Sequence, residues 1–467
     1  MSLSKPIALK RDEKEVAMNE QYYHAPGVYN NPLEIKNSSR RKFVKQLLGG
    51  AAATAIWPSL KFGEWNAPLR TLRESAAELS GIEQDNEYFW ELVKEHFPIR
   101  KGLIMMNAAN LCPSPFVVQQ LVFKYTQDID SDPSFPNRAK FDDIKEEARA
   151  AVARYLGADP DEIAITRNTS EGNNNVISGL SFRKGDEIVI WDENHPTANV
   201  AWDVRAQRFG FTVKKVKTPP RPGNAAELLE AFRTALTEQT RVLAFSHLSN
   251  LTGVVLPAKG LCRMARERGI LTLVDGAQTF GAFSLDLHDM GCDFYTGSAH
   301  KWLCGPREVG ILYIRKEKID ELWPLMVGDG WEESVKRGAR KFETQGQRDD
   351  ARVAALGKAV EFHNIIGKER IESRLRRLTA AMKNEIRKRI SGAEIVTPLD
   401  PELSGGIVVF SVPELAAMDL GAVLESLYQK HNIGCNVFPW GIRLSPHIYN
   451  ILDEVDKVID AVKSFKN

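Results

Sequence analysis

Short runs of β-branched and aromatic residues alternate with amphipathic helical stretches from residue 107 onward. This alternation favours a largely parallel sheet with helices on both faces, because parallel strands need a crossover helix between them. The expected strands are 162–166, 187–191, 241–246, 271–275, 293–297 and 309–315. Ligands of such sheets bind beyond the carboxyl ends of the strands, so polar residues there are the first candidates for a functional site.

The chain is long enough, at 467 residues, to form two or three domains. After Ala351 the pattern changes to a long helix, an apolar run at 405–412 and a closing amphipathic helix. We therefore expect a large domain over 116–350 and a smaller C-terminal α/β domain over 351–467. An N-terminal arm over 67–115 is expected to precede them.

Composition excludes several classes of protein. Hydrophobic residues make up 43% and charged residues 26%, the ordinary range of a soluble globular protein. A formal net charge of +1 offers no electrostatic reason to expect nucleic acid as a partner. The five cysteines are scattered, with no CxxC pair and no Cys/His cluster at metal-binding spacing, so we expect neither a zinc site nor a disulfide scaffold.

The segment SRRKFVK at residues 39–45, followed by a Gly/Ala-rich apolar run, resembles a twin-arginine export signal. The apolar run is too short and too weakly apolar for a secure membrane span. We expect residues 1–66 to form this signal and an N-terminal extension, and the protein to be periplasmic or otherwise exported. The small-x-small pattern at 53–55 lies early for a cleavage site, so cleavage stays open.

Polar residues follow the first two expected strands. In TRNTSEGNNN (166–175), Thr169 and Ser170 would offer hydroxyl and backbone N–H groups to a phosphate at a helix N-terminus. The same stretch also fits an ordinary N-terminal helix cap. In DENHPTANVAW (192–202), His195 fits either a capped loop or a flat ring stacked on an aromatic cofactor.

A carboxylate ends another apolar strand. Asp275 needs a partner, because burying an unpaired carboxylate is costly, and the protonated pyridine nitrogen of pyridoxal phosphate (PLP) would be such a partner. Gln278, with help from Asn250, would then reach the phenolic oxygen of the same ring.

The string Ser298, Ala299, His300, Lys301 follows one more strand. Ser298 and His300 would reach a phosphate, and Lys301 supplies an amine that can form a Schiff base. A lone lysine is usually a surface charge. Here the four motifs succeed one another at strand ends within residues 169–301, which favours a single site.

In that order the motifs resemble those of the class V aminotransferase family, PLP enzymes of fold type I. The resemblance covers about residues 105–467. It implies an α/β fold with a mostly parallel central sheet in the large domain, and Lys301 as Schiff-base lysine and base at the Cα of an amino-acid substrate. It also implies phosphate contacts from Thr169, Ser170, Ser298 and His300, ring stacking by His195, pyridine-nitrogen and phenolic-oxygen contacts from Asp275, Gln278 and Asn250, and α-carboxylate binding by Arg443.

The stretch FETQGQRD (342–349) resembles FExxGTRD of isopenicillin N epimerase-like proteins, in which a Gly-Thr pair of the neighbouring subunit reaches the phosphate. Gln347 stands in place of the threonine, and its amide can still donate to a phosphate. This resemblance implies a homodimer with the active site at the subunit interface.

Several reactions fit these residues. Epimerisation, transamination and elimination share the same first steps at Cα, so the site residues leave the outcome open. A C–S lyase or cysteine desulfurase-like enzyme is the alternative, but desulfurases carry a nucleophilic cysteine on a loop well before the arginine, whereas Cys435 lies only eight positions before Arg443. A non-catalytic PLP-fold binding protein is disfavoured by the presence of Lys301, Asp275 and Arg443.

The export hypothesis predicts the effect of a conservative change. Replacing Arg40 and Arg41 by lysine keeps the charge but removes the paired arginines, so the double variant should stay in the cytoplasm. Cell fractionation checks this, and unchanged delivery to the periplasm would count against the signal.

Overall fold

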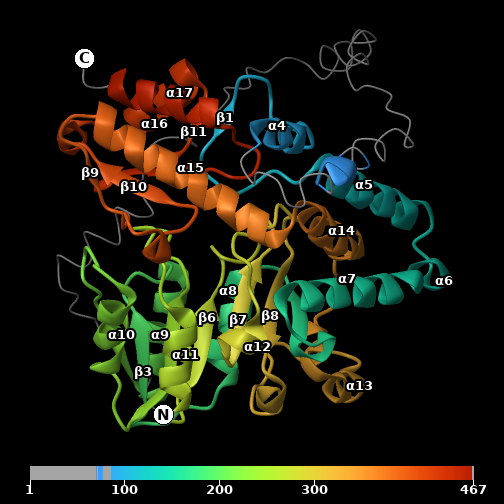
Figure 1. Cartoon of the computed structure of the whole chain (residues 1–467). Helices are drawn as coiled ribbons and strands as arrows, with labels where there is room; N and C mark the ends of the chain where they lie inside the picture. The colour runs from blue at the N-terminus through green and yellow to red at the C-terminus, as the bar shows by residue number, and fades with distance from the viewer. Residues whose placement is uncertain (1–69, 71, 77–85, 465–467) are drawn as a thin grey trace, which may run out of the picture.

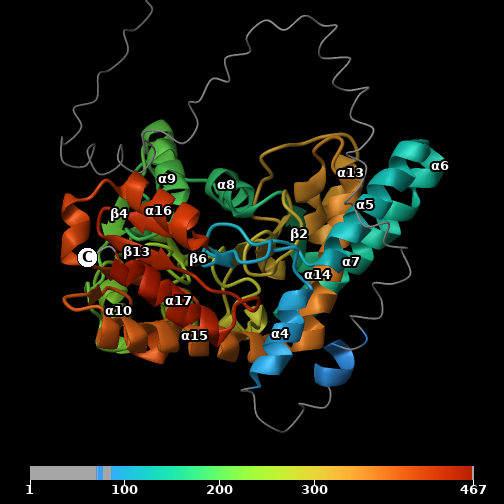
Figure 2. The same ribbon diagram turned by 90° about the horizontal axis from the view of Figure 1, so that it is seen from above.

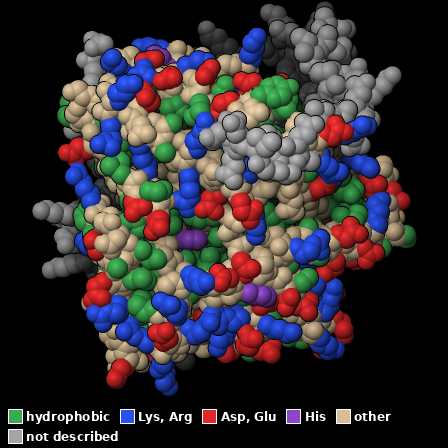
Figure 3. Space-filling model, in the orientation of Figure 1, with side chains coloured by type: hydrophobic (Ala, Val, Ile, Leu, Met, Phe, Trp, Pro, Cys, Tyr) green, Lys and Arg blue, Asp and Glu red, His purple; other side chains and the backbone are tan. Residues whose placement is uncertain are grey.

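The computed structural model describes residues 70, 72–76 and 86–464 (Figure 1). The predicted twin-arginine segment lies outside these residues. Within the described part of the chain, no helix is long and apolar enough to cross a membrane. The face drawn in Figure 3 intersperses basic and acidic side chains.

A seven-stranded sheet in the order β2-β8-β7-β6-β5-β3-β4 forms the centre of the large domain. Its pairs are parallel from β4 through β7, whereas β8 is antiparallel to both β7 and β2. The predicted fold, an α/β architecture with a mostly parallel sheet, is confirmed. The strands are β2 (Ile163–Thr166), β3 (Glu187–Trp191), β4 (Thr212–Val216), β5 (Thr240–Ser246), β6 (Leu271–Asp275), β7 (Phe294–Ser298) and β8 (Gly310–Ile314).

Alternate residues of each central strand enter two different cores, one on each face of the sheet. Val242 and Ala244 of β5 pack with Trp202 of α9 (Pro196–Phe209). Leu243 and Phe245 pack in the opposite core with α10 (Ala225–Arg233) and α11 (Ala258–Arg266). The two cores explain why these strands read as continuous apolar runs, since a sheet covered on both faces has no solvent side.

The small domain is built on a four-stranded antiparallel sheet in the order β12-β13-β10-β9. Helix α15 packs on α17 above this sheet (Figure 1). The apolar positions of α15, among them Leu375 and Met382, are fully buried, so its many basic residues belong to an amphipathic helix. The elements are β9 (Glu394–Ile395), β10 (Val408–Ser411), β12 (Asn436–Phe438), β13 (Gly441–Leu444), α15 (Lys368–Arg389), α16 (Leu420–His431) and α17 (Leu452–Lys463).

The N-terminal arm joins the small domain. The helices α5, α7 and α14 pack together beside the large domain. Strand β1 (Ile104–Met105) pairs in parallel with β11 (Ile433–Gly434). Helix α14 packs against α5 and α7 and leads directly into α15. In Figure 2 the α5, α6 and α7 helices stand at one side of the molecule. The helices outside the two sheets have these bounds: α4 (Glu87–Glu95), α5 (Phe116–Ser131), α6 (Phe135–Arg138), α7 (Lys140–Leu156), α13 (Trp331–Ser334) and α14 (Asp350–Ile366).

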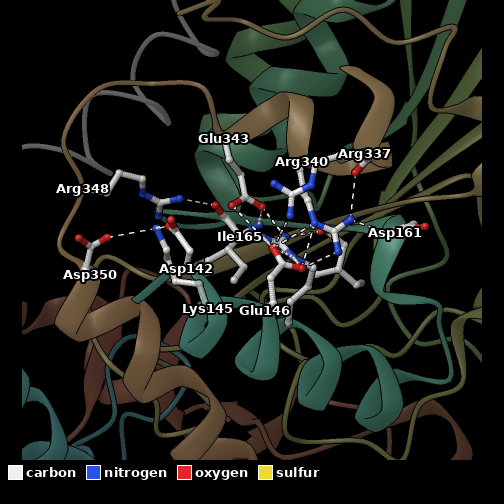
Figure 4. A network of polar contacts seen from close by, with 12 residues as sticks. Asp142, Lys145, Glu146, Asp161, Ile165, Arg337, Arg340, Glu343, Arg348 and Asp350 are labelled. Atoms are coloured by element: carbon white, nitrogen blue, oxygen red, sulfur yellow. Dashed lines mark hydrogen bonds and ion pairs between the residues drawn. The ribbon is translucent and has the colours of Figure 1, made fainter. Parts of the chain in front are cut away.

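Side chains close the outer edge of β2, which has a neighbouring strand on one side only (Figure 4). Glu343 accepts a 2.7 Å hydrogen bond from Ile165 N, and Arg348 donates to the Ile165 carbonyl. Arg149 holds Glu343 through two hydrogen bonds and donates at 2.6 Å to the Ile163 carbonyl. An open strand edge exposes unpaired backbone groups, so this ionic cluster protects the strand that leads into the first polar motif.

Candidate active site

A cavity of about 170 Å³ lies at the carboxyl ends of the central strands. Strand register explains its position, since Ser246 of β5 pairs with Asp275 of β6, and Asp275 pairs with Thr296 of β7. Nine of the eleven predicted site residues line the cavity: Thr169, Ser170, His195, Asn250, Asp275, Gln278, Ser298, His300 and Lys301. Arg443 and Gln347 are not among the lining residues.

The first turn of α8 (Thr169–Gly179) forms one wall of the cavity. Asn168 caps the helix by accepting a 3.0 Å hydrogen bond from Glu171 N. The cap is therefore Asn168, and Thr169 and Ser170 occupy the first turn, where backbone N–H groups are unsatisfied within the helix. Thr169 N lies 2.9 Å and Thr169 Oγ1 2.7 Å from Ser298 Oγ, so two predicted phosphate contacts come from different elements but touch.

Asp275 ends β6 with its side chain nearly buried. Its Oδ2 accepts a 2.8 Å hydrogen bond from Asn173 Nδ2, and its Oδ1 accepts one of 3.0 Å from Ala277 N. Both donors fix the orientation of the carboxylate. A carboxylate has about four acceptor positions, so it can also accept from a group inside the cavity.

Lys301 follows β7 and is only partly exposed. Burial lowers the pKa of its amine to about 8, while the charge of Asp275 opposes that shift and the charge of Arg443 adds to it. Near neutral pH the amine of Lys301 is therefore neutral far more often than that of an ordinary lysine, although most of it is still protonated. Only the neutral amine can attack a carbonyl carbon or accept a proton.

Two histidines on the cavity wall are held neutral. Burial, and then the charge of Lys301, lower the pKa of His195, and the same two causes lower the pKa of His300 to about 4. His195 is also the N-cap of α9, where its Nδ1 lies 3.3 Å from Thr197 N. A neutral His195 ring in that position is compatible with both interpretations of the sequence, a helix cap and a flat surface for stacking on a cofactor.

Gln278 and Asn250 line the cavity, but other groups already engage them. Gln278 Nε2 donates to the Ala109 carbonyl at 3.0 Å, and its Oε1 accepts from Trp302 Nε1 at 2.8 Å. One N–H of the amide is left for the predicted contact with a phenolic oxygen, which stays a prediction. Asn250 offers its backbone carbonyl to Arg443 Nη1 at 3.0 Å.

Arg443 comes from β13 of the small domain and is nearly buried. Its Nη2 donates to Asn107 Oδ1 at 3.0 Å, and its guanidinium lies 5.2 Å from the centre of the Phe438 ring. Its charge lowers the pKa of both His195 and Lys301, which places it near the cavity although it is not among the lining residues.

Gln347 is exposed and does not line the cavity of its own chain. Its Oε1 accepts a 2.6 Å hydrogen bond from Arg138 Nη2, and its Nε2 donates to the Arg348 carbonyl at 2.9 Å. The predicted contact is with the cofactor of a partner subunit, so it stays a prediction.

The sequence reasoning missed four polar residues of the cavity wall, which are Asn168, Asn173, Thr197 and Ser246. Asn173 was detectable, because it stands four residues after Thr169 and therefore lies on the same face of the helix. Its contact with Asp275 joins residues 102 positions apart and could not be read from the local pattern.

The lining residues fit PLP. A helix N-terminus with hydroxyl groups suits a phosphate, and the buried carboxylate of Asp275 suits a protonated ring nitrogen. The partly neutral amine of Lys301 suits a carbonyl carbon. These three features are chemically distinct and lie in one cavity.

Similarity to known proteins supports the same family independently of the site geometry. The model of the family described as aminotransferase class-V matches residues 116–458. Isopenicillin N epimerase of Streptomyces clavuligerus is 30% identical over 390 residues, covering 80% of this chain and 97% of that protein. Isopenicillin N epimerase of Amycolatopsis lactamdurans is 33% identical over 396 residues, covering 80% and 98%.

Cysteine desulfurases are also similar. The probable cysteine desulfurase 2 of Mycobacterium leprae is 30% identical over 348 residues, covering 68% of this chain and 80% of that protein. Among solved structures, a mutant of C-DES with glycine covalently linked to its PLP cofactor has a TM-score of 0.72 at 24% identity, covering 79% of this chain and 98% of that one. A cysteine desulfurase from Thermococcus onnurineus has a TM-score of 0.71 at 24% identity, covering 80% and 97%. At this level of identity the structures support the fold alone.

The lowered pKa of Lys301 predicts how its reactivity depends on pH. In the cofactor-free protein, the rate at which trinitrobenzenesulfonate labels Lys301 should rise with a midpoint at about pH 8 and level off above it. An exposed lysine should level off only near its ordinary pKa of about 10.4. Peptide mass spectrometry at each pH measures the rate.

A charge variant tests the cause of this shift. Asp275 raises the pKa of Lys301, so Asp275→Asn should move the midpoint to a still lower pH. A midpoint near pH 10 in the unaltered protein would contradict the account of the buried amine.

Proposed function

The chain belongs to the class V aminotransferase family, and on that premise we propose that this PLP-dependent enzyme moves a proton at the Cα of an amino-acid substrate. The proposed outcome is epimerisation or transamination. The observation that carries the proposal is the Lys301 amine, whose pKa is lowered to about 8 in a cavity that also holds Asp275. The similarity to two isopenicillin N epimerases along most of the chain supports it.

PLP, when bound, supplies a carbonyl carbon for an amine and a ring that delocalises the electron pair left at Cα. The first turn of α8, with Thr169 and Ser298, would hold its phosphate, and Asp275 its ring nitrogen. Lys301 would hold it covalently, and His195 would face the ring. Each role uses a group that lines the cavity.

Lys301 is the proposed base. With PLP and substrate bound, the freed amine of Lys301 would be the group that takes the proton from Cα. A base works best when its pKa lies near the working pH, because part of it is then unprotonated and that part is basic enough to take a proton. The pKa of about 8 meets this condition.

Arg443 is the proposed binding residue for the substrate α-carboxylate. The Asn250 carbonyl and Asn107 Oδ1 accept from its two terminal nitrogens and hold the plane of the guanidinium. Both acceptors are neutral, so these contacts orient the positive charge without cancelling it. A planar guanidinium suits a carboxylate, which it can bind with two parallel hydrogen bonds.

The cysteines favour this proposal over a desulfurase-like reaction, which needs a nucleophilic cysteine. All five are buried. Burial raises the pKa of Cys435 to about 12, and the same cause raises the pKa of Cys262 to about 12. The thiolate is the nucleophilic form of cysteine, so neither suits attack on a sulfur atom.

We also propose that the enzyme is a homodimer exported by the twin-arginine route. Exposed apolar side chains, among them Val200 and Val204 of α9 and Trp323 and Val327 after β8, offer a surface that a second copy would cover. The loop that carries Trp323 is tied to α8, because Leu325 N donates to Asn175 Oδ1 at 3.1 Å. A dimer on this surface would lie beside the phosphate-binding helix.

Proton movement at Cα predicts that deuterium from the solvent is incorporated at that carbon. With a panel of L- and D-amino acids in deuterated water, at least one substrate should either be inverted with deuterium at Cα, or be converted to its keto acid while the recovered amino acid gains deuterium at Cα. Mass spectrometry and chiral chromatography measure both. Lys301→Ala should abolish the incorporation, because it removes the base.

Other products would point elsewhere. Sulfide or persulfide from cysteine or cystine, without inversion or keto acid from any substrate, would favour the lyase alternative. The absence of deuterium in every amino acid of the panel, with PLP bound, would contradict the proposed chemistry.

A further inference from the structure

We infer that Asn173 is a positioning residue which, together with Thr296, holds the Asp275 carboxylate in place for the ring nitrogen of PLP. The inference rests on the role of Asp275 in the proposed function. Asn173 and Thr296 lie behind Asp275 on α8 and β7, two elements that meet at the inner wall of the cavity.

Three buried side chains form a chain of hydrogen bonds. Thr296 Oγ1 donates to Asn173 Oδ1 at 2.7 Å, and Asn173 Nδ2 donates to Asp275 Oδ2 at 2.8 Å. The exposed fractions are 0% for Thr296, 3% for Asn173 and 7% for Asp275, so water contributes little along the chain. Ala277 N donates to the second oxygen of Asp275.

The chain of donors runs in one direction only. An amide oxygen accepts hydrogen bonds but cannot donate them, so the Thr296 hydroxyl must be the donor in its hydrogen bond to Asn173 Oδ1. If the Asn173 amide were turned over, its oxygen would face the Asp275 carboxylate, and two acceptors would meet without a proton. The contacts with the Thr296 hydroxyl and the Asp275 carboxylate therefore favour the same orientation of the Asn173 amide.

Close packing of α8 against β7 makes this contact possible. A Cβ atom at Gly172 would lie 2.8 Å from Thr296 Cγ2, closer than real Cβ atoms come to other atoms. Glycine at 172 thus lets the helix approach the strand until the next side chain, Asn173, reaches between Thr296 and Asp275.

The consequence is electrostatic. A bound ring nitrogen and Asp275 share one proton, which lies on the nitrogen when the carboxylate is the more stable anion. Hydrogen bonds donated to a carboxylate stabilise its charged form. Asn173 therefore favours the proton on the ring, where it strengthens the withdrawal of electrons from Cα.

Helix α8 would contribute to the binding of PLP at two places, the phosphate and the ring nitrogen. Thr169 in its first turn lies at the proposed phosphate site, and Asn173 one turn later contacts the partner of the ring nitrogen. A shift of α8 would change both contacts together.

The test uses PLP labelled with ¹⁵N in the ring, bound to the full protein, because the ¹⁵N chemical shift reports whether that nitrogen carries a proton. The unaltered protein should give the protonated signal. Asn173→Leu keeps a similar volume but removes the donor, so the ratio of protonated to unprotonated nitrogen should fall about tenfold. Thr296→Val, which frees the amide to turn, should shift it in the same direction by less.

Asn175→Leu is the matched control for general damage to α8. Asn175 is also buried on this helix, but its amide contacts the Glu171 carbonyl and Leu325 N instead of Asp275. This variant should leave the ¹⁵N signal protonated even if it melts at a lower temperature.

Each outcome bears on one claim. An unprotonated signal in the unaltered protein, or no change in Asp275→Asn, would overturn the assignment of Asp275 itself. If both behave as expected and Asn173→Leu keeps the protonated signal, the inference about Asn173 fails and the proposed function stands. Should Asn173→Leu not fold, an unchanged signal in Thr296→Val overturns the inference equally.

Discussion

The alignment of parallel strands is the constraint on which the rest of the structure depends. Register between β5, β6 and β7 brings Ser246, Asp275 and Ser298 to one edge of the sheet. Because both faces of the sheet are covered, a carboxylate at that edge is nearly buried and must find partners. Its fixed donors, Asn173 and Ala277 N, come from the elements that flank it.

Burial then adjusts the chemistry of the groups around this carboxylate. The same low-dielectric surroundings lower the pKa of Lys301 to about 8 and keep His300 neutral. Asp275 moderates the shift of Lys301, and Arg443 from the small domain increases it. A residue of the small domain thus contributes to the lowered pKa of a lysine in the large domain.

The sequence predicted the large domain well for a physical reason. Strands covered on both faces leave uninterrupted apolar runs, and the polar residues that interrupt them mark the strand ends. Strand β4 escaped notice because it is an edge strand whose two central lysines break the apolar pattern. The contact of Arg443 with Asn107 spans 336 positions, so only the folded chain shows it. Gln347 could be singled out by motif, but a single chain cannot show a contact that needs its partner.

We propose that Lys301 holds PLP covalently. Reducing the PLP-loaded protein with borohydride makes the linkage permanent, and peptide mass spectrometry then locates the phosphopyridoxyl group. The account predicts this group on Lys301 in nearly all of the protein. Its appearance mainly on another lysine, or its absence from a protein that has bound PLP, would contradict the account.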